Sequence, residues 1–204
     1  RKMNLFKAPQ LSEEWWDLKV GKISGTRFGQ VISTRENRLV YELMNEILTG
    51  QCDMSIFVTD DMQYGIDNED VALKLYEEQS GIKVEKVGAI ISDLTRDHIA
   101  SPDGINIQGG IVQEVKCTQN GHTHLERYFE GIDSKHFSQC ANYFAVSDEV
   151  QEVHYISYCG YRKERPMFYH VLKREDCQKL IDKGRKMIPE IMKEVKDKIE
   201  KYKF

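Results

Sequence analysis

The sequence predicts a single α/β domain in which a central mixed sheet lies between layers of helices. Its length of 204 residues is enough for one hydrophobic core and short for two. Helical periodicity runs through the first sixty residues, whereas segments from Val84 onward are rich in Val, Ile, Tyr and Phe and are broken by turn residues. One helix interrupts the strands and another ends the chain, so both faces of the sheet can be covered. We therefore expect one domain over 1–204, with a helical part at 1–60, a core at 61–175 and a C-terminal helix at 176–204.

The N-terminal part is expected to hold two helices. The first is short and begins at Ser24 or Thr26, either of which can cap it. Its apolar positions are Phe28, Val31 and Ile32. The second begins near Arg35 and ends at Gly50, a residue that readily adopts the left-handed conformation closing a helix. Its apolar face comprises Leu39, Leu43 and Ile47.

A third helix is predicted at about 65–79, and it carries an unexpected charge. Positions 69, 72, 73 and 76 share one face, because they are separated by three, four and seven residues. Ala72, Leu73 and Tyr76 suit a buried face, but Glu69 does not. A carboxylate there is costly unless it is paired or bound to a metal ion. We expect Glu69 to bind a second metal ion or to support the ligands of a first.

The predicted strands cover 84–92, 98–100, 111–117, 150–158 and 167–173. Turns at 102–104 and 109–110 separate the first strands, and a helix at about 134–145 precedes the fourth. The last helix begins near Glu175, and Pro189 should kink it. Its apolar stripe comprises Leu180, Gly184, Met187, Ile191, Val195 and Ile199.

Composition excludes several classes of protein. With 40% apolar and 30% charged residues the chain is neither disordered nor membrane-spanning, and it has no apolar run of membrane length or signal-peptide type. The five cysteines are scattered without a C-x-x-C pair, which excludes a disulfide framework and a tetrahedral zinc site. We expect a cytoplasmic protein in a reducing compartment, without a membrane partner.

The net charge of −4 argues, taken alone, against a partner as negative as nucleic acid. A local basic lining is nevertheless available near the N-terminus. Its candidate members are Lys19, Lys22, Arg27, Arg35 and Arg38.

A candidate metal centre follows from the strand at 111–117 and the turn before it. Glu114 and Lys116 are two residues apart, so a strand places both side chains on one face. If the segment that ends in Asp103 pairs with this strand, two carboxylates meet and form an oxygen site of the kind that Mg²⁺ prefers. Bound metal ions activate water and offset negative charge during phosphodiester hydrolysis, and Lys116 can act on the water or the developing charge. Whether burial lowers the pKa of Lys116 enough for a base-like role is left open.

Each pattern has an ordinary structural explanation. An S-P-D-G sequence is common turn chemistry, and E-x-K in a strand usually marks a solvated face. Only their order and spacing, with Gly65 and Glu69 upstream, make the metal centre the better interpretation.

These residues resemble the YqaJ/lambda-exonuclease family of phage-type recombination nucleases, within the PD-(D/E)XK superfamily. The resemblance covers about 15–158. Its motifs are Trp15 with the 19–26 segment, Gly65 with Glu69, Ala72, Tyr76 and the 80–81 Ser-Gly pair, the 101–104 S-P-D-G turn, the 114–117 E-V-K-C strand, and Gln139.

The resemblance implies a restriction-endonuclease-like fold and a Mg²⁺-dependent exonuclease, with Mn²⁺ as a substitute, that digests linear double-stranded DNA from 5′ to 3′. It also implies a homotrimeric ring around the DNA, a single-strand annealing protein as partner, and the host cytoplasm if the chain is phage-encoded. Asp103 and Glu114 would hold the metal, Lys116 would act on the water, and Glu69 and Gln139 would complete the site.

The resemblance further implies a pocket for the 5′-phosphate formed by Lys19, Thr26 and Ser101. A helix that opens at 24–26 offers free N–H groups to an anion, which supports this placement. Lys19 stands where the family has arginine, so the bidentate fork is missing and dependence on a 5′-phosphate is weakened. Met62 corresponds to the residue that separates the end base pair.

Three alternatives remain at this point. Another PD-(D/E)XK endonuclease or a RecB-like repair nuclease would share the centre, although the scattered cysteines do not suit an iron–sulfur cluster. A non-catalytic DNA-binding module would have no need for Asp103, Glu114 and Lys116 together. His122, His124 and His136 are interpreted as DNA contacts or surface residues, not metal ligands, because their spacing is not that of a metal site.

Overall fold

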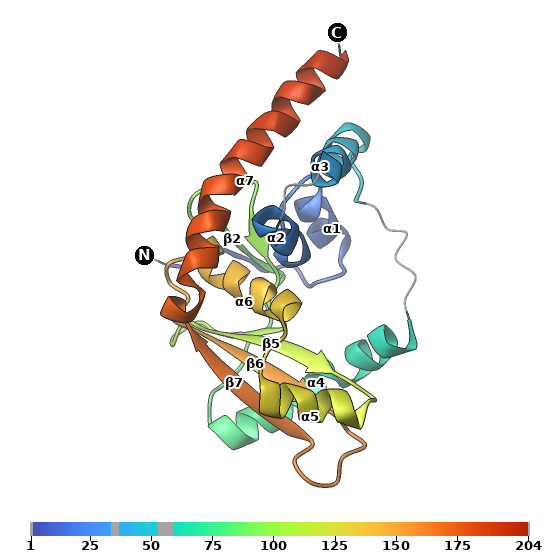
Figure 1. Cartoon of the computed structure of the whole chain (residues 1–204), viewed down its shortest axis with the longest axis vertical. Helices are drawn as coiled ribbons and strands as arrows, with labels where there is room; N and C mark the ends of the chain where they lie inside the picture. The colour runs from blue at the N-terminus through green and yellow to red at the C-terminus, as the bar shows by residue number, and fades with distance from the viewer. Residues whose placement is uncertain (1, 34–36, 53–58, 204) are drawn as a thin grey trace.

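The computed structural model describes residues 2–33, 37–52 and 59–203. Three helices form the N-terminal part (Figure 1): α1 (Glu13–Lys19), α2 (Gly25–Ile32) and α3 (Asn37–Thr49). Ser24 is the N-cap of α2, which settles the choice between Ser24 and Thr26. Helix α3 ends before Gly50, whose φ is +68°, as predicted. Leu39 and Leu43 are buried whereas Ile47 is 38% exposed, and Arg35 lies outside the described residues.

Helix α4 (Asp60–Ser80) begins five residues earlier than predicted. Thr59 caps it by accepting a hydrogen bond from the Met62 N–H, and Asp60 and Asp61 in the first turn favour the positive end of the helix dipole. Gly65 therefore lies inside the helix instead of starting it. The helix ends at Gly81, which is left-handed with φ +73°.

Two sheets form instead of one. The smaller is antiparallel and has the order β1 (Leu5–Phe6), β2 (Ala89–Ile91), β3 (Ile99–Ala100). The larger has the order β4 (Gly104–Asn106), β5 (Ile111–Cys117), β6 (Glu152–Tyr158), β7 (Met167–Lys173). Strands β5 and β6 are parallel and the other pairs antiparallel, so the larger sheet is mixed, as predicted.

The predicted strand at 84–92 is wrong over most of its length. Only 89–91 is a strand, because Glu85 makes a single bridge to Ile105 and Gly88 lies against the Ala8 backbone, where an added Cβ would stand 2.1 Å from the carbonyl oxygen. Strands β1 and β4 were not predicted. Strands β5 and β7 have the predicted bounds.

Helices cover both faces of the larger sheet (Figure 1). Helix α4 packs on one face, and α5 (Gly121–Glu130) and α6 (Ser134–Val146) pack on the other. Helix α5 was not predicted, whereas α6 is one residue longer than predicted. The last helix, α7 (Arg174–Lys203), packs against α2, α3 and α6 and runs through Pro189 without interruption. No helix among the described residues is long and apolar enough to cross a membrane.

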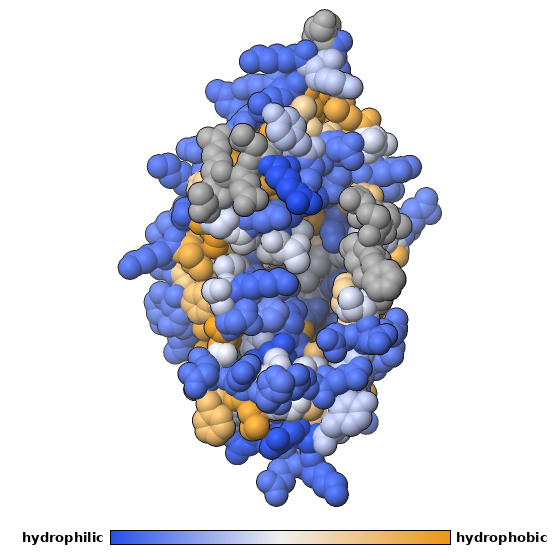
Figure 2. Space-filling model, turned by 45° about the vertical axis from the view of Figure 1, so that its right-hand side comes forward, coloured by the Kyte–Doolittle hydropathy of each residue, from blue (hydrophilic) through white to orange (hydrophobic). Residues whose placement is uncertain are grey.

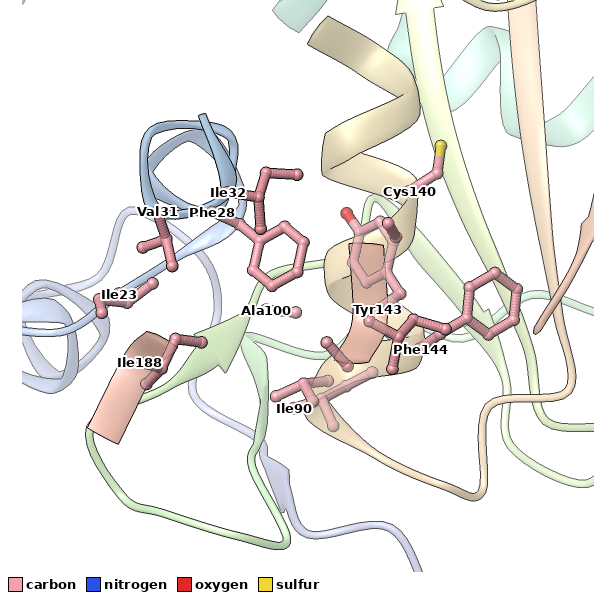
Figure 3. Close-up of a cluster of buried hydrophobic side chains, with 14 of the residues drawn as sticks. Ile23, Phe28, Val31, Ile32, Ile90, Ala100, Cys140, Tyr143, Phe144 and Ile188 are labelled. Atoms are coloured by element: carbon pink, nitrogen blue, oxygen red, sulfur yellow. The ribbon is translucent and has the colours of Figure 1, made fainter. Parts of the chain in front are cut away.

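The main core joins α2, α6, α7 and the smaller sheet (Figure 3). Phe28 points from α2 toward the aromatic side chains of α6. A Cβ at Gly184 of α7 would stand 2.2 Å from the Phe28 ring, so a glycine is needed where the two helices approach. The buried stripe of α7 includes Ile181, Ile188 and Met192, whereas the predicted Leu180 and Met187 lie at its edge. A second cluster lies between α4 and the opposite face of the larger sheet.

Candidate active site

The antiparallel ladder of β4 and β5 brings Asp103 to Glu114. Gly104 pairs with Gln113, and the Asp103 N–H donates to the Gln113 carbonyl at 3.1 Å. The Asp103 side chain is fixed as well, because its Oδ2 accepts a hydrogen bond from the Val115 N–H at 2.6 Å. The predicted pairing of the S-P-D-G turn with the E-x-K strand is therefore what the structure has.

Glu114 is fully buried and has two partners. Lys116 Nζ contacts one of its oxygens and the Tyr143 hydroxyl donates to the other. The same hydroxyl lies 3.1 Å from the Ser101 carbonyl, so Tyr143 joins the turn that holds Asp103 to strand β5. Tyr143 was not predicted as a site residue, because an aromatic residue on a helix of this composition is expected in the core.

The electrostatics are those of two crowded carboxylates beside one ammonium. Burial, and next the charge of Glu114, raises the pKa of Asp103 well above its usual value. Burial alone would lower the pKa of Lys116, but Glu114 and Asp103 outweigh it and the pKa is raised. The two carboxylates thus favour the ammonium form of Lys116.

Glu69 lies apart from this pair. Its Oε1 is 2.5 Å from Lys86 Nζ, which is also 3.1 Å from Asp70, and its side chain is 33% exposed. It still lies within electrostatic range, because its charge contributes to the raised pKa values of Asp103 and Cys117. Among the described residues no three acidic, histidine or cysteine side chains are grouped closely enough to hold a metal ion. Two of the three predicted carboxylates, Asp103 and Glu114, thus lie together. The third, Glu69, is paired with Lys86 apart from them.

Gln139 is half-buried on α6, one turn before Tyr143. Its Cγ would stand 3.2 Å from a Cβ at Gly25, so it lies against the first residue of α2. The start of α2 therefore lies against α6, the helix whose Tyr143 hydroxyl donates to Glu114.

Trp15 links two of the residues predicted to bind a phosphate. Its Nε1 lies 3.1 Å from Ser101 Oγ, and Lys19 Nζ lies 4.1 Å from the centre of its ring. Burial lowers the pKa of Lys19. Thr26 is exposed on the first turn of α2, where Ser24 makes no side-chain cap. Lys19 and Ser101 thus both contact Trp15.

The basic lining is weaker than its composition indicated. Arg27 pairs with the buried Glu46 at 2.5 Å, and Arg38 pairs with Glu42 at 2.8 Å on the same helix. Both guanidinium charges are therefore partly neutralised. Met62 is 45% exposed in the first turn of α4, where it can meet a large ligand.

Of the three histidines expected at the surface, His124 differs from the expectation. His124 is buried and bonded to Ser157 Oγ at 2.9 Å and to the Arg165 carbonyl at 3.0 Å, so it is neither a surface residue nor a DNA contact. His122 is exposed. His136 is half-buried and its Nδ1 lies 2.5 Å from Asp133 Oδ2.

The donor set at Asp103 and Glu114 fits a hard divalent cation. Two adjacent carboxylates, one with a pKa raised by burial and by the charge of the other, repel each other unless a positive charge lies between or beside them. Lys116 supplies one such charge. A bound cation would supply the rest.

Fold and site together define an α/β protein with a dicarboxylate centre in which Glu114 is buried and Asp103 half-buried. Residues 14–150 match the model of the YqaJ-like viral recombinase domain, and the chain belongs to this family, which confirms the resemblance inferred from the motifs. No curated protein sequence matches it.

Solved structures confirm the predicted fold class. An alkaline exonuclease from Laribacter hongkongensis superposes with a TM-score of 0.83 and 26% identity over 94% of this chain and 96% of that one. The same protein in complex with dAMP gives the same values. A phage-related exonuclease from Haemophilus somnus, at 14% identity, shares the fold with a TM-score of 0.65 over 89% of this chain and 96% of its own.

Proposed function

We propose that this chain is a Mg²⁺-dependent exonuclease that digests one strand of linear double-stranded DNA, from 5′ to 3′, and leaves the other for annealing. The observation that carries the proposal is the half-buried Asp103 next to the buried Glu114, beside the Lys116 ammonium. Membership of a viral recombinase family and the likeness to an alkaline exonuclease support DNA as the substrate.

Each residue of the centre would have a separate role in hydrolysis. Asp103 and Glu114 would hold Mg²⁺, or Mn²⁺ in its place, which when bound supplies an activated water and offsets charge on the phosphate. The Val115 N–H orients Asp103, and the Tyr143 hydroxyl orients Glu114. Lys116 has three N–H donors and contacts Glu114, so it can also donate to the attacking water or to a phosphate oxygen.

The duplex end would be received by residues around this centre. Lys19, Thr26 and Ser101 would bind the 5′-phosphate, and Met62 would stack at the end base pair. Glu69 and Gln139 would complete the site from α4 and α6. In the same proposal the chain assembles as a homotrimeric ring in the cytoplasm and passes its product to a single-strand annealing protein.

The test uses a linear duplex labelled at either the 5′ or the 3′ end, with and without a 5′-phosphate, in Mg²⁺ and in EDTA. We expect release of mononucleotides from the 5′ end in Mg²⁺ and none in EDTA. A covalently closed circular plasmid serves as the control and should stay intact. Cleavage of the circle would instead identify an endonuclease, and full activity in EDTA would exclude the metal.

A further inference from the structure

Helix α5 and the turn between β6 and β7 form an exposed aromatic surface outside the catalytic centre. We define the aromatic surface by the residues Leu125, Tyr128, Phe129, Arg162, Arg165 and Phe168. Together with His124 and Glu164 they line a cavity of about 380 Å³. That volume is at the lower end of the range for small-ligand sites.

Two aromatic side chains of this surface are exposed to solvent. Phe129 is 74% exposed and Tyr128 is 38% exposed, and their rings meet edge to face with centroids 5.0 Å apart. Phe168 lies behind Tyr128 at 5.2 Å and holds it in place. Figure 2 shows a mostly hydrophilic face with apolar side chains gathered in separate patches, one of them at the end of the molecule that carries α5 and this turn. Exposed apolar patches of this kind mark sites of interaction.

Positive charge accompanies the rings. The turn residues 162–165 read Arg-Lys-Glu-Arg, a net positive segment in a chain of net charge −4. The Arg165 guanidinium stacks 4.8 Å from the centre of the Tyr128 ring, and Arg165 has a positive φ of +50° that few residues of its type adopt. Glu164 lines the same cavity and offsets one of these charges, so Arg162 and Arg165 leave the cavity net positive, whereas Glu126 and Glu130 of α5 line a different hollow.

A second exposed stack lies on the same turn. Tyr161 is 71% exposed and stacks on Tyr64 of α4, with centroids 6.0 Å apart. The Tyr64 hydroxyl accepts a hydrogen bond from the Gly160 N–H at 3.0 Å, which fixes the pair to the turn. The turn therefore offers rings on the α4 side as well as on the α5 side.

The aromatic surface is joined directly to the catalytic strand. Helix α5 follows β5, and Arg127 of α5 donates to the Lys116 carbonyl at 3.0 Å. Tyr128 and Phe129 directly follow Arg127 in α5, so this hydrogen bond ties their segment to the strand that carries Glu114 and Lys116.

We propose that the aromatic surface binds single-stranded DNA, with bases stacked on Tyr128 and Phe129 and phosphates paired with Arg162 and Arg165. Every base has a face that can stack on an aromatic ring, and arginine suits the phosphate. In a duplex these faces are covered by neighbouring bases, so the surface selects the single strand. That this strand is the undigested product rests on the proposed function; the binding itself does not.

The experiment measures binding of a fluorescently labelled oligothymidylate to the full chain in EDTA by anisotropy. We expect Phe129→Ala to raise Kd about tenfold, a typical loss for one stacked base. The matched control is Tyr202→Ala on α7, which removes a ring that is 75% exposed and should leave Kd within about twofold. Equal affinity of Phe129→Ala and the wild-type chain would overturn the proposal.

Two further variants make the test independent of folding. Arg162→Ala should lower the slope of log Kobs against log salt concentration by about 0.7, the value for one lost phosphate contact on a single strand. Phe129→Trp should keep the affinity and show quenching of its fluorescence on oligonucleotide addition, beyond that of Trp15 and Trp16 in the wild-type chain. An unchanged slope together with absent quenching would count against stacking.

Sedimentation velocity separates a nucleic-acid site from a protein interface. If Phe129→Ala changes the oligomeric state and leaves oligonucleotide affinity unaltered, the surface joins subunits and the proposal is wrong. Digestion of linear duplex in Mg²⁺ is measured in parallel. A wild-type chain that binds the oligonucleotide but digests no duplex would refute the proposed function and leave the aromatic surface standing.

Discussion

The two faces of β5 carry different kinds of side chain. The face toward α6 carries Glu114 and Lys116, whose charges are buried or nearly so. The face toward α4 carries Gln113 and Val115, and Val115 packs in an apolar cluster with Ala72, Leu73 and Tyr76 of α4. Alternation along one strand thus separates a charged centre from a conventional core by the thickness of the sheet.

The two faces of β5 therefore differ in their effect on the stability of the fold. Apolar burial on the α4 side stabilises the sheet, at about 25 cal/mol per Å² of surface removed from water. Buried carboxylates on the α6 side are tolerated only because they are neutralised and hydrogen-bonded. Substitutions on the charged face should therefore affect activity, and substitutions on the apolar face should affect stability.

The largest effect is expected at the charged face. Lys116→Ala and Asp103→Ala should each reduce the rate of duplex digestion by at least about 10²-fold, because each removes a group that acts on the reacting phosphate or its water. Single-turnover digestion in saturating Mg²⁺ measures the rate, and circular dichroism checks the fold.

Lys196→Ala is the control for this prediction. Lys196 is 59% exposed and pairs with Asp97 at 2.8 Å, away from the centre. Its loss should leave the rate unchanged. Digestion at the wild-type rate by either centre variant would remove that residue from the reaction.

On the apolar face, Tyr76→Phe should lower the free energy of unfolding by about 1–3 kcal/mol. The Tyr76 hydroxyl is 2.6 Å from His154 Nδ1 and 3.4 Å from Gln113 Nε2, so both buried groups lose a partner. Gln113 Oε1 already lacks a hydrogen bond within the described part of the chain. Urea unfolding measures the change, and a fall in kcat of the folded variant would show that the two faces are coupled.

Asp103→Asn should raise stability in EDTA at pH 8 by about 1 kcal/mol, or roughly 2–4 °C in Tm. Burial and Glu114 raise the pKa of Asp103, so the folded protein holds this proton more tightly than the unfolded chain. The contribution of Asp103 is therefore present at acid pH and lost as pH rises through the raised pKa. Thermal unfolding between pH 4 and 9 should show this decline in the wild-type chain and less of it in the variant. Parallel curves would contradict the assignment.

The smallest effect is expected at Glu69. Glu69→Gln should raise the Mg²⁺ concentration for half-maximal rate by about threefold, because an exposed charge paired with Lys86 is well screened. Asp70→Asn is the matched control, since Asp70 contacts the same lysine but is 88% exposed. If both variants behave alike, Glu69 acts only through Lys86.

The sequence predicted the parts of the site that depend on local geometry. Alternation in a strand places Glu114 beside Lys116, and a turn followed by a strand brings Asp103 back to them. The pairing of Glu69 with Lys86 could not be predicted, because Lys86 lies outside the helix in a segment that we expected to be a strand. Tyr143 is part of the site only through tertiary packing of α6. Helix α5 was missed although Leu125, Tyr128 and Phe129 stand at helical spacing, because it is only 10 residues long and begins with Gly121.

The pairing of Gly104 with Gln113 has a consequence for how this chain can change over generations. Moving β4 by one position along β5 would turn its side chains to the opposite surface, and Asp103 would no longer meet Glu114. A single inserted residue between Asn106 and Ile111 would demand a compensating bulge, whereas the turn after β6 can grow without disturbing either acid. Length variation among descendants should thus be tolerated in the turn after β6 and not in this short hairpin.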